Sequence, residues 1–221
     1  MSMMDESVVV CPKCGAEFTF RTWKSINTML DPQMKEAVRD GSAFMAECPE
    51  CGAKTLVDYE FQYHQMEDDL MIYYVHGQDS VDEICAMLSE QKEDDDIFTG
   101  LLKDHYTVRI VRSLNQFREK LAILDAGLDD RVVELCKLAF LGSVQQKTDT
   151  PMERTELLFD QGEGSDHSVV VLEDGKPTLT VNWIPALYDR FEYDFEDILR
   201  ERENSEYIVD REWALKLFSE K

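Results

Sequence analysis

The hydrophobic pattern of the chain changes character along its length and predicts an α+β protein. Up to about residue 78 the apolar positions form short, strand-like runs, and 58–65 and 69–77 read as a hairpin because both are rich in aromatic and β-branched residues. Apolar residues then recur mostly at helical spacing. We therefore expect a first domain at 1–78, a helical middle region at 79–147 and a small α+β domain at 148–221.

The middle region contains three helix patterns. A capping-box pattern at Ser80 and Glu83 precedes apolar residues on one helical face, and a second capping box begins the next helix at Ser113, which Gly127 ends. The third pattern covers 128–142, and we expect it to stop at Gly142. Before the last two, the run 105–113 alternates between apolar and polar residues as a strand does.

The last region predicts a hairpin followed by two helices. The alternating runs within 168–183 are joined by Asp174-Gly175, the residue pair that a two-residue type I′ turn prefers. A helix should follow Pro185, and Asp210 is expected to cap a last short helix.

The chain uses four of its six cysteines in two near-identical pentapeptides, CPKCG at 11–15 and CPECG at 48–52. A C-x-x-C turn places two thiolates on one side of a metal ion, and the following glycine lets the backbone turn away. Two such turns supply the four soft donors that tetrahedral zinc needs. We therefore predict zinc ligation, with two disulfides, a rubredoxin-like iron site and an iron–sulfur cluster as the alternatives; the predicted ligands are Cys11, Cys14, Cys48 and Cys51.

A site with four cysteine ligands is coordinatively closed, so the predicted ion, one zinc per chain, is structural rather than catalytic. The sequence contains no nucleophile pair, phosphate loop or metalloprotease motif, and it nominates no catalytic or organic-cofactor-binding residue. We therefore expect a protein that is not an enzyme. The other two cysteines, Cys85 and Cys136, lie on apolar helical faces and are expected to be buried as small hydrophobic residues.

The segment between the two cysteine pairs is long, with 33 residues between Cys14 and Cys48, where about 15–20 are usual. The excess, at 25–44, reads as an inserted helix. We expect Asp31 to cap this helix and Gly41 to end it.

These motifs resemble the CpXC domain of bacteria and archaea. The matching stretches are CPKCGAEF, SINTMLDPQMKEAV, CPECG and YHQMEDDLMIYYV, which together span about 10–76, and LNQFREKLAILDAGLDDRVVELCKL at 114–138. The resemblance implies a zinc-ribbon-like fold and places the zinc role on the four cysteines. It also matches Tyr63 and His64 to the family's aromatic pair, but it brings no role for that pair and no established activity.

The net charge of the chain restricts the classes of partner that it can bind. The formal net charge is −23 at pH 7, which repels phosphate backbones and anionic lipids and disfavours nucleic acid and membrane as partners. A basic protein or peptide is the partner that this charge favours, and a homodimer is compatible with the sequence. The N-terminal residues do not form a signal-peptide pattern, so we expect a cytoplasmic protein.

Three hypotheses about function follow. The first is a non-enzymatic zinc-binding protein that serves as a protein-interaction or regulatory module with an acidic surface. The alternative is a zinc-ribbon regulator that binds nucleic acid, and an uncharacterised enzyme is a third hypothesis without nominated residues. The alternative depends on the few basic residues around the cysteines, which are Lys13, Arg21, Lys24, Lys35, Arg39 and Lys54.

Overall fold

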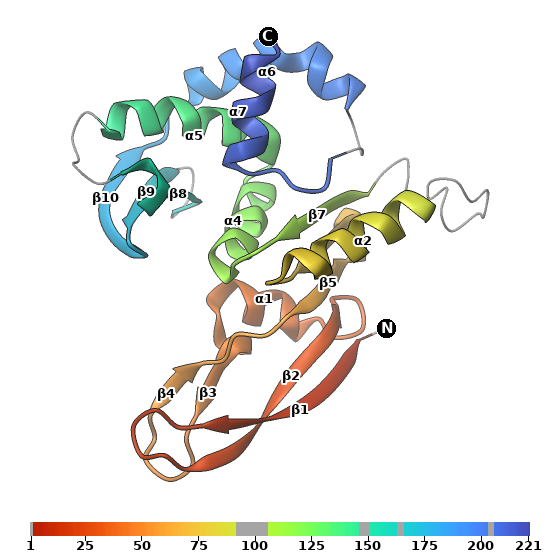
Figure 1. The fold of residues 1–221 in the computed structure, drawn as a ribbon, viewed down its shortest axis with the longest axis vertical. Helices are drawn as coiled ribbons and strands as arrows, with labels where there is room; N and C mark the ends of the chain where they lie inside the picture. The colour runs from red at the N-terminus through yellow and green to blue at the C-terminus, as the bar shows by residue number, and fades with distance from the viewer. Residues whose placement is uncertain (1, 92–105, 146–150, 163–165, 203–205) are drawn as a thin grey trace. The chain divides into compact units, whose positions relative to one another are not determined.

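The computed structural model is mixed α+β and divides into two compact units, Met1–Leu114 and Asn115–Lys221 (Figure 1). Each unit is described by itself. The structure describes residues 2–91, 106–145, 151–162, 166–202 and 206–221.

The first unit contains a five-stranded sheet in the order β1-β2-β5-β6-β7. The β1–β2 and β5–β6 neighbours are antiparallel, whereas β2–β5 and β6–β7 are parallel. The sheet is therefore built from two hairpins and a later strand that joins its end. The strands are β1 (Met3–Val10), β2 (Glu17–Asn27), β5 (Phe61–Gln65), β6 (Leu70–Tyr74) and β7 (Thr107–Val111).

The β5–β6 hairpin is the centre of this sheet and confirms the hairpin expected within 58–77. Tyr63 of β5 pairs directly with Ile72 of β6, and both side chains are completely buried. A short 3₁₀ turn, η2 (Met66–Asp68), connects the two strands. Aromatic and β-branched side chains at alternate positions thus form the core of the unit, because successive residues of a strand point to opposite faces.

A second, two-stranded sheet of β3 (Met45–Glu47) and β4 (Lys54–Leu56) also belongs to this unit. It follows α1 (Gln33–Asp40) and the 3₁₀ turn η1 (Ser42–Phe44), and α2 (Gln78–Gln91) lies between β6 and β7 in the chain.

The inserted helix between the cysteine pairs is confirmed, and it ends where the sequence predicted. It occupies α1 and ends at Gly41, which has φ 84°. The cap predicted at Asp31 is wrong, because no side chain caps α1 and the Asp31 carboxylate instead accepts a hydrogen bond from the Gln33 side chain. The first residues of the proposed insertion extend β2 to Asn27, since pairing with β5 satisfies their backbone groups.

The second unit contains a three-stranded antiparallel sheet in the order β10-β9-β8. Asp174 and Gly175 join β9 to β10 and have φ values of 51° and 73°, which confirms the type I′ turn, since that turn requires positive φ at both central residues. The sequence pattern did not predict β8. The strands are β8 (Thr155–Asp160), β9 (Ser168–Glu173) and β10 (Lys176–Asn182).

Four helices described in the second half of the chain are α4 (Leu114–Asp125), α5 (Asp130–Gln145), α6 (Pro185–Glu201) and α7 (Arg211–Ser219). The expected stop at Gly142 is wrong, because α5 continues through it. Leu141 and Val144 are both buried, and their burial offsets the roughly 1 kcal/mol that an interior glycine costs a helix. No helix within the described ranges combines the length and the apolar composition that crossing a membrane requires.

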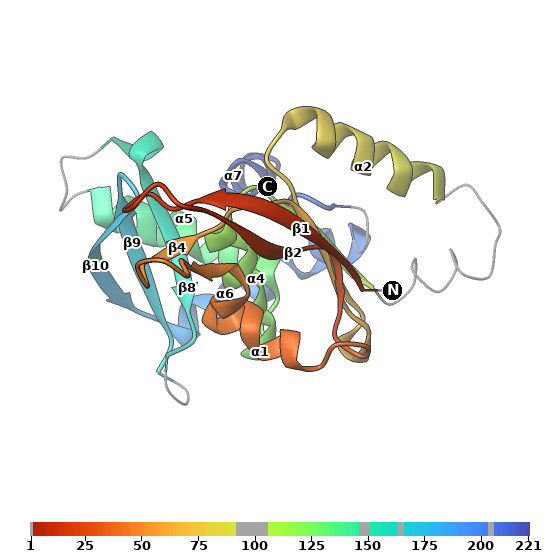
Figure 2. The ribbon, with the colours of Figure 1, turned by 90° about the horizontal axis from the view of Figure 1, so that it is seen from below.

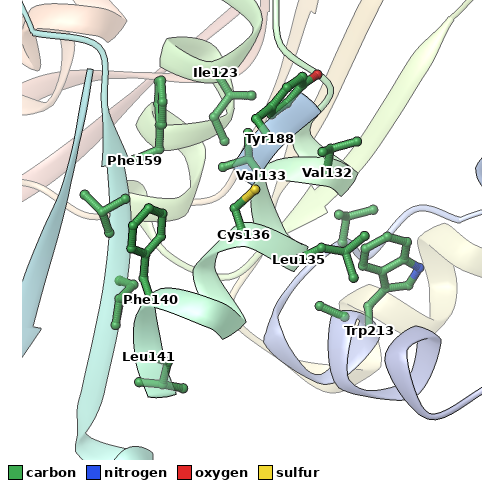
Figure 3. Packing of buried hydrophobic residues seen from close by; sticks show 14 of the residues in the cluster. Ile123, Val132, Val133, Leu135, Cys136, Phe140, Leu141, Phe159, Tyr188 and Trp213 are labelled. Atoms are coloured by element: carbon green, nitrogen blue, oxygen red, sulfur yellow. The ribbon is translucent and has the colours of Figure 1, made fainter. Parts of the chain in front are cut away.

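The core of the second unit forms where α5 packs against the other helices and the sheet (Figure 3). Cys136 is completely buried there beside aliphatic and aromatic side chains, as a small hydrophobic residue is. Phe140 of α5, Phe159 of β8 and Trp213 of α7 belong to the same cluster. Segments far apart in the sequence therefore share one core.

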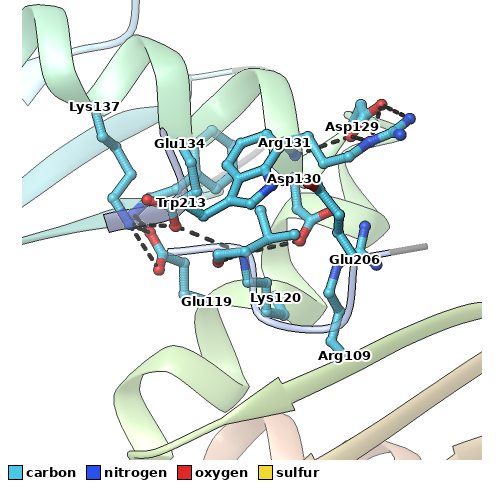
Figure 4. A network of polar contacts seen from close by, with 12 residues as sticks. Arg109, Glu119, Lys120, Asp129, Asp130, Arg131, Glu134, Lys137, Glu206 and Trp213 are labelled. Atoms are coloured by element: carbon cyan, nitrogen blue, oxygen red, sulfur yellow. Dashed lines mark hydrogen bonds and ion pairs between the residues drawn. The ribbon is translucent and has the colours of Figure 1, made fainter. Parts of the chain in front are cut away.

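Buried ion pairs connect α4 to α5 within this unit (Figure 4). Lys137 Nζ lies 2.8 Å from Glu119 Oε1 and 2.9 Å from Glu134 Oε1. Lys120 Nζ lies 2.8 Å from Asp130 Oδ2 and 3.5 Å from Glu134 Oε1. The four side chains other than Lys137 are at most 4% exposed, so these charges are compensated inside the protein rather than by water.

The expected helical middle region is not a uniform helical body. Its strand, β7, belongs to the five-stranded sheet of the first unit, while α4 and α5 pack in the second half of the chain. The domain boundaries at 78 and 147 stay predictions, and residue 147 lies outside the described residues.

Replacing Asp210 with alanine should lower the free energy of unfolding by about 1 kcal/mol, the usual value of an N-cap. The Asp210 carboxylate accepts a hydrogen bond of 3.0 Å from the Trp213 backbone N–H at the start of α7, which confirms the predicted cap. Urea denaturation would measure the change. Asp210→Asn is the matched control, because asparagine caps as well; an equal loss in both variants would contradict the capping role.

Candidate metal centre

Each cysteine pair lies in the tight turn of a β-hairpin. Cys11 follows β1, and its N–H donates to the Ala16 carbonyl while the Gly15 N–H donates back to the Cys11 carbonyl, both at 2.9 Å. Gly15 has φ 75°, a conformation that residues with a Cβ rarely adopt. The second turn, between β3 and β4, repeats both bonds at the same distance, with Cys48, Gly52 and Ala53 in the corresponding positions.

The fold brings the four predicted ligands together. Cys11 Sγ lies 3.7 Å from Cys51 Sγ, and Cys14 Sγ lies 3.6 Å from Cys48 Sγ. All four sulfurs lie within 4.8 Å of one another. Four sulfurs bound tetrahedrally at about 2.3 Å from an ion would be separated by about 3.8 Å. The cluster therefore has the dimensions of a site for a single metal ion.

These distances do not fit the disulfide alternative. A disulfide joins two sulfurs at about 2.05 Å, and all six cysteines of the chain are free in the structure. A [4Fe–4S] cluster would hold each thiolate on a different iron and a [2Fe–2S] cluster would divide the four thiolates between two irons, so either cluster would spread the sulfurs farther apart than one ion does.

The surroundings of the sulfurs favour a bound cation. The backbone N–H groups of Cys14 and Lys13 lower the pKa of the Cys11 thiol to about 6. The Ala16 N–H acts in the same direction on Cys14, but the nearby sulfurs of Cys51 and Cys11 outweigh it and raise the pKa of Cys14 to about 12. A divalent metal ion would reduce this conflict, because it binds the deprotonated thiolates and offsets part of their negative charge.

Among the described residues, these cysteines form the one group of three or more potential ligands that lie close enough to share an ion. Cys11 and Cys48 are buried, Cys51 is partly buried and Cys14 is exposed. If all four thiolates bind one ion, the tetrahedron has no position left for water or a substrate. The centre can hold two hairpins together, but it cannot activate a bound water.

Tyr63 and His64 are neighbours on β5 and therefore point to opposite faces of the sheet. The buried Tyr63 hydroxyl donates to Gln65 at 2.6 Å and accepts from Arg39 at 3.2 Å. His64 Nε2 lies 3.0 Å from the Tyr106 hydroxyl, and burial lowers the pKa of its imidazole. These contacts tie α1 to β5, and they tie Tyr106, the residue directly before β7, to β5 as well.

The sequence did not reveal a polar cluster at one end of the β5–β6 hairpin. The Tyr74 hydroxyl lies 2.5 Å from Asp58 Oδ1 and 2.7 Å from His76 Nε2. Burial, followed by the Asp58 carboxylate, raises the pKa of Tyr74. Asp58 precedes β5 and His76 follows β6, and these two ends meet because the strands are antiparallel. That pairing is the signal by which the cluster could have been found.

The stability of the first unit should fall as the pH drops below about 4.5, the ordinary pKa of a glutamic acid. Lys35 of α1 lies 3.2 Å from Glu67 and 3.3 Å from Asp68, and the Thr28 hydroxyl donates to Glu67 at 2.7 Å. Burial opposes ionisation of Glu67, but Thr28 and Lys35 outweigh it and lower its pKa; Gln65, followed by Lys35, lowers the pKa of Asp68.

Carboxyl groups with lowered pKa values stabilise the folded state above their unfolded pKa, and this contribution is lost as they are protonated. Solvent screens the partly exposed pairs, so we expect at most about 1 kcal/mol. Thermal unfolding between pH 3 and 6 would measure the loss, and Lys35→Met should flatten the pH profile. An equally steep profile in that variant would contradict the assignment.

A model of the CpXC protein family matches residues 9–137, more than half of the chain. The chain belongs to the CpXC family. The matched range contains both cysteine pairs and α1 and ends at Lys137 within α5, which confirms the resemblance noted in the sequence. Comparison with curated proteins and with solved structures gave no match.

Proposed function

We propose that this CpXC protein binds one zinc ion through Cys11, Cys14, Cys48 and Cys51, and that the ion is structural. The observation that supports the proposal best is the sulfur spacing of 3.6–3.7 Å, close to the edge of a zinc–thiolate tetrahedron. Thiolates are soft ligands, which suits zinc or iron better than magnesium or calcium.

Elemental analysis and native mass spectrometry of protein purified without added metal test this proposal. We expect one zinc per chain, and none after Cys14→Ser. Cys85→Ser is the matched control, since Cys85 lies on α2 and should not affect the metal. Iron in place of zinc, or a metal-free protein with oxidised cysteine pairs, would contradict the proposal.

We further propose that the protein acts without catalysis, as an interaction or regulatory module in the cytoplasm. The closed coordination supports a scaffolding role for the metal, and the reducing cytoplasm keeps thiols available for it. The net charge of −23 supports a basic protein or peptide as the partner.

The contacts of the basic side chains near the cysteines favour a protein partner over nucleic acid. Lys24 lies 2.8 Å from Asp5, and Lys35 contacts two carboxylates. Arg39 donates to Tyr63 and to Gln65. Three of the six basic residues that a nucleic-acid site would need are thus engaged within the protein.

Affinity capture with the metal-loaded protein as bait tests the electrostatic part of the proposal. We expect basic proteins to be retained at low ionic strength and released at high ionic strength, because salt screens the attraction. The matched control is an unrelated acidic protein of similar size and charge. Equal capture by both baits, or retention that ignores salt, would contradict a specific acidic interaction surface.

A further inference from the structure

In the described part of the chain, β1 pairs with β2 alone, so its outer edge is an open end of the five-stranded sheet. Its neighbour in that sheet is β2, and the strand order ends at β1 (Figure 2). The Glu6 N–H donates to the side chain of Asp5 at 2.9 Å, which shows that it points away from β2. Because backbone groups alternate in direction along an antiparallel strand, those of Met4, Val8 and Val10 point outward as well.

The side chains along this edge are apolar and exposed. Val8 is 71% exposed, Val10 58% and Met4 56%, and the three lie on one face of the strand because they occupy alternate positions. Sheet edges are commonly protected by lysine, proline or a bulge in mid-strand. The segment 3–10 contains neither lysine nor proline, and its one irregularity lies at its beginning, between Met3 and Met4.

The charge of the β1–β2 hairpin indicates which partner can cover the outer edge of β1. The whole chain carries −23, so most surfaces of two copies repel each other. The β1–β2 hairpin, residues 3–27, is an exception, because its charged residues balance. They are the acidic Asp5, Glu6 and Glu17 and the basic Lys13, Arg21 and Lys24.

We propose that β1 pairs antiparallel with β1 of a second copy of this chain, which joins the two five-stranded sheets across a two-fold axis. Two registers use nearly the whole strand, one centred on Glu6 and one centred on Ser7. The first sets two Glu6 carboxylates directly opposite each other, which is destabilising. The second places Glu6 opposite Val8 and Met4 opposite Val10 of the second copy, so the axis passes through Ser7.

This register defines which backbone groups and which residues of the two copies meet. Outward-pointing Glu6 and Val8 exchange backbone hydrogen bonds with the second copy, and Asp5 gives up the Glu6 N–H while keeping its ion pair with Lys24. Ser7 then faces its own counterpart in a non-hydrogen-bonded pair, where Cα atoms lie about 4.5 Å apart. That separation allows a disulfide between cysteines placed there.

Light scattering, and cross-linking through one introduced cysteine at a time, test the pairing in the metal-loaded full chain. We expect a dimer whose Ser7→Cys variant forms an intermolecular disulfide in most chains under mild oxidation. Met4→Cys alone should not cross-link, because the two Met4 positions lie at opposite ends of the interface. A mixture of Met4→Cys and Val10→Cys chains should cross-link, and Val8→Lys/Val10→Lys should convert the dimer to a monomer.

Met29→Lys is the matched control for added charge, since Met29 is exposed but lies outside β1, and this variant should stay dimeric. A monomeric wild-type protein at high micromolar concentration would overturn the proposal. So would a dimer that cross-links equally through positions 4 and 7, or one that persists in the double lysine variant. The dimer depends on the outer edge of β1, so a failure to dimerise would leave the proposed metal site and the proposed basic partner unaffected.

Discussion

Replacing Cys48 with serine should release the metal and abolish the cooperative unfolding of the Met1–Leu114 unit. In the proposed site the ion would join the β1–β2 hairpin to the β3–β4 hairpin, and the strands β3 and β4 have only three residues each. A two-stranded hairpin of this size is not stable in water by itself. Zinc binding in small domains supplies about 10–16 kcal/mol of apparent free energy, which is comparable to the whole stability of a typical domain, about 5–15 kcal/mol.

Hydrogen exchange measured by mass spectrometry would locate the effect. We expect β3, β4 and the cysteine turns to lose protection in Cys48→Ser or after chelation, while α5 and β9 of the second unit keep theirs. Cys85→Ser is the control and should retain both metal and protection. Wild-type protection of β3 and β4 in the Cys48→Ser protein would show that the hairpins are held together without the ion.

Replacing Lys137 with methionine should destabilise the second unit by about 3–5 kcal/mol, the usual cost of removing one partner from a buried ion pair. Lys137 contacts both Glu119 and Glu134, and the variant would leave these carboxylates buried without their common counterion. Glu119 also accepts the Phe159 N–H at 2.6 Å, so the damage should extend from the helices to β8. Urea denaturation would measure the loss.

The exposed pair Arg190–Asp194 on α6 provides the matched control. Arg190→Met removes the same kind of contact, at 2.6 Å, from a side chain that is 69% exposed, and we expect a cost below about 1 kcal/mol because water already solvates both groups. A similar loss of unfolding free energy in both variants would mean that burial does not determine how much the ion pairs of Lys137 contribute to stability.

Titration of Lys137 gives a second, independent readout. Burial opposes its charge, but the Glu119 and Glu134 carboxylates outweigh burial and raise its pKa above the ordinary 10.5. A lysine with a raised folded-state pKa stabilises the protein below its unfolded pKa, and the stability is lost as the pH rises further. The wild type should therefore weaken above about pH 10.5, and Lys137→Met should show less of this alkaline loss.

The sequence alone determined the features that depend on neighbouring residues. The two cysteine turns, the Asp174-Gly175 turn and the Asp210 cap were all predicted correctly, because each is decided by a few adjacent backbone dihedrals and one or two side chains. The β5–β6 hairpin followed from alternating residues separated by a short turn. The four cysteines that the fold brings together could be named for the same reason, since each pair lies within four residues of chain.

The tertiary structure alone decided which distant segments meet. The parallel pairs β2–β5 and β6–β7 have no local signal, because their strands are separated by long connections and any register satisfies the backbone. The pairing of Lys137 with Glu119 and the passage of α5 through Gly142 depend on packing against other elements, which outweighs the local preference. Likewise, only the strand order places β1 at one end of the five-stranded sheet.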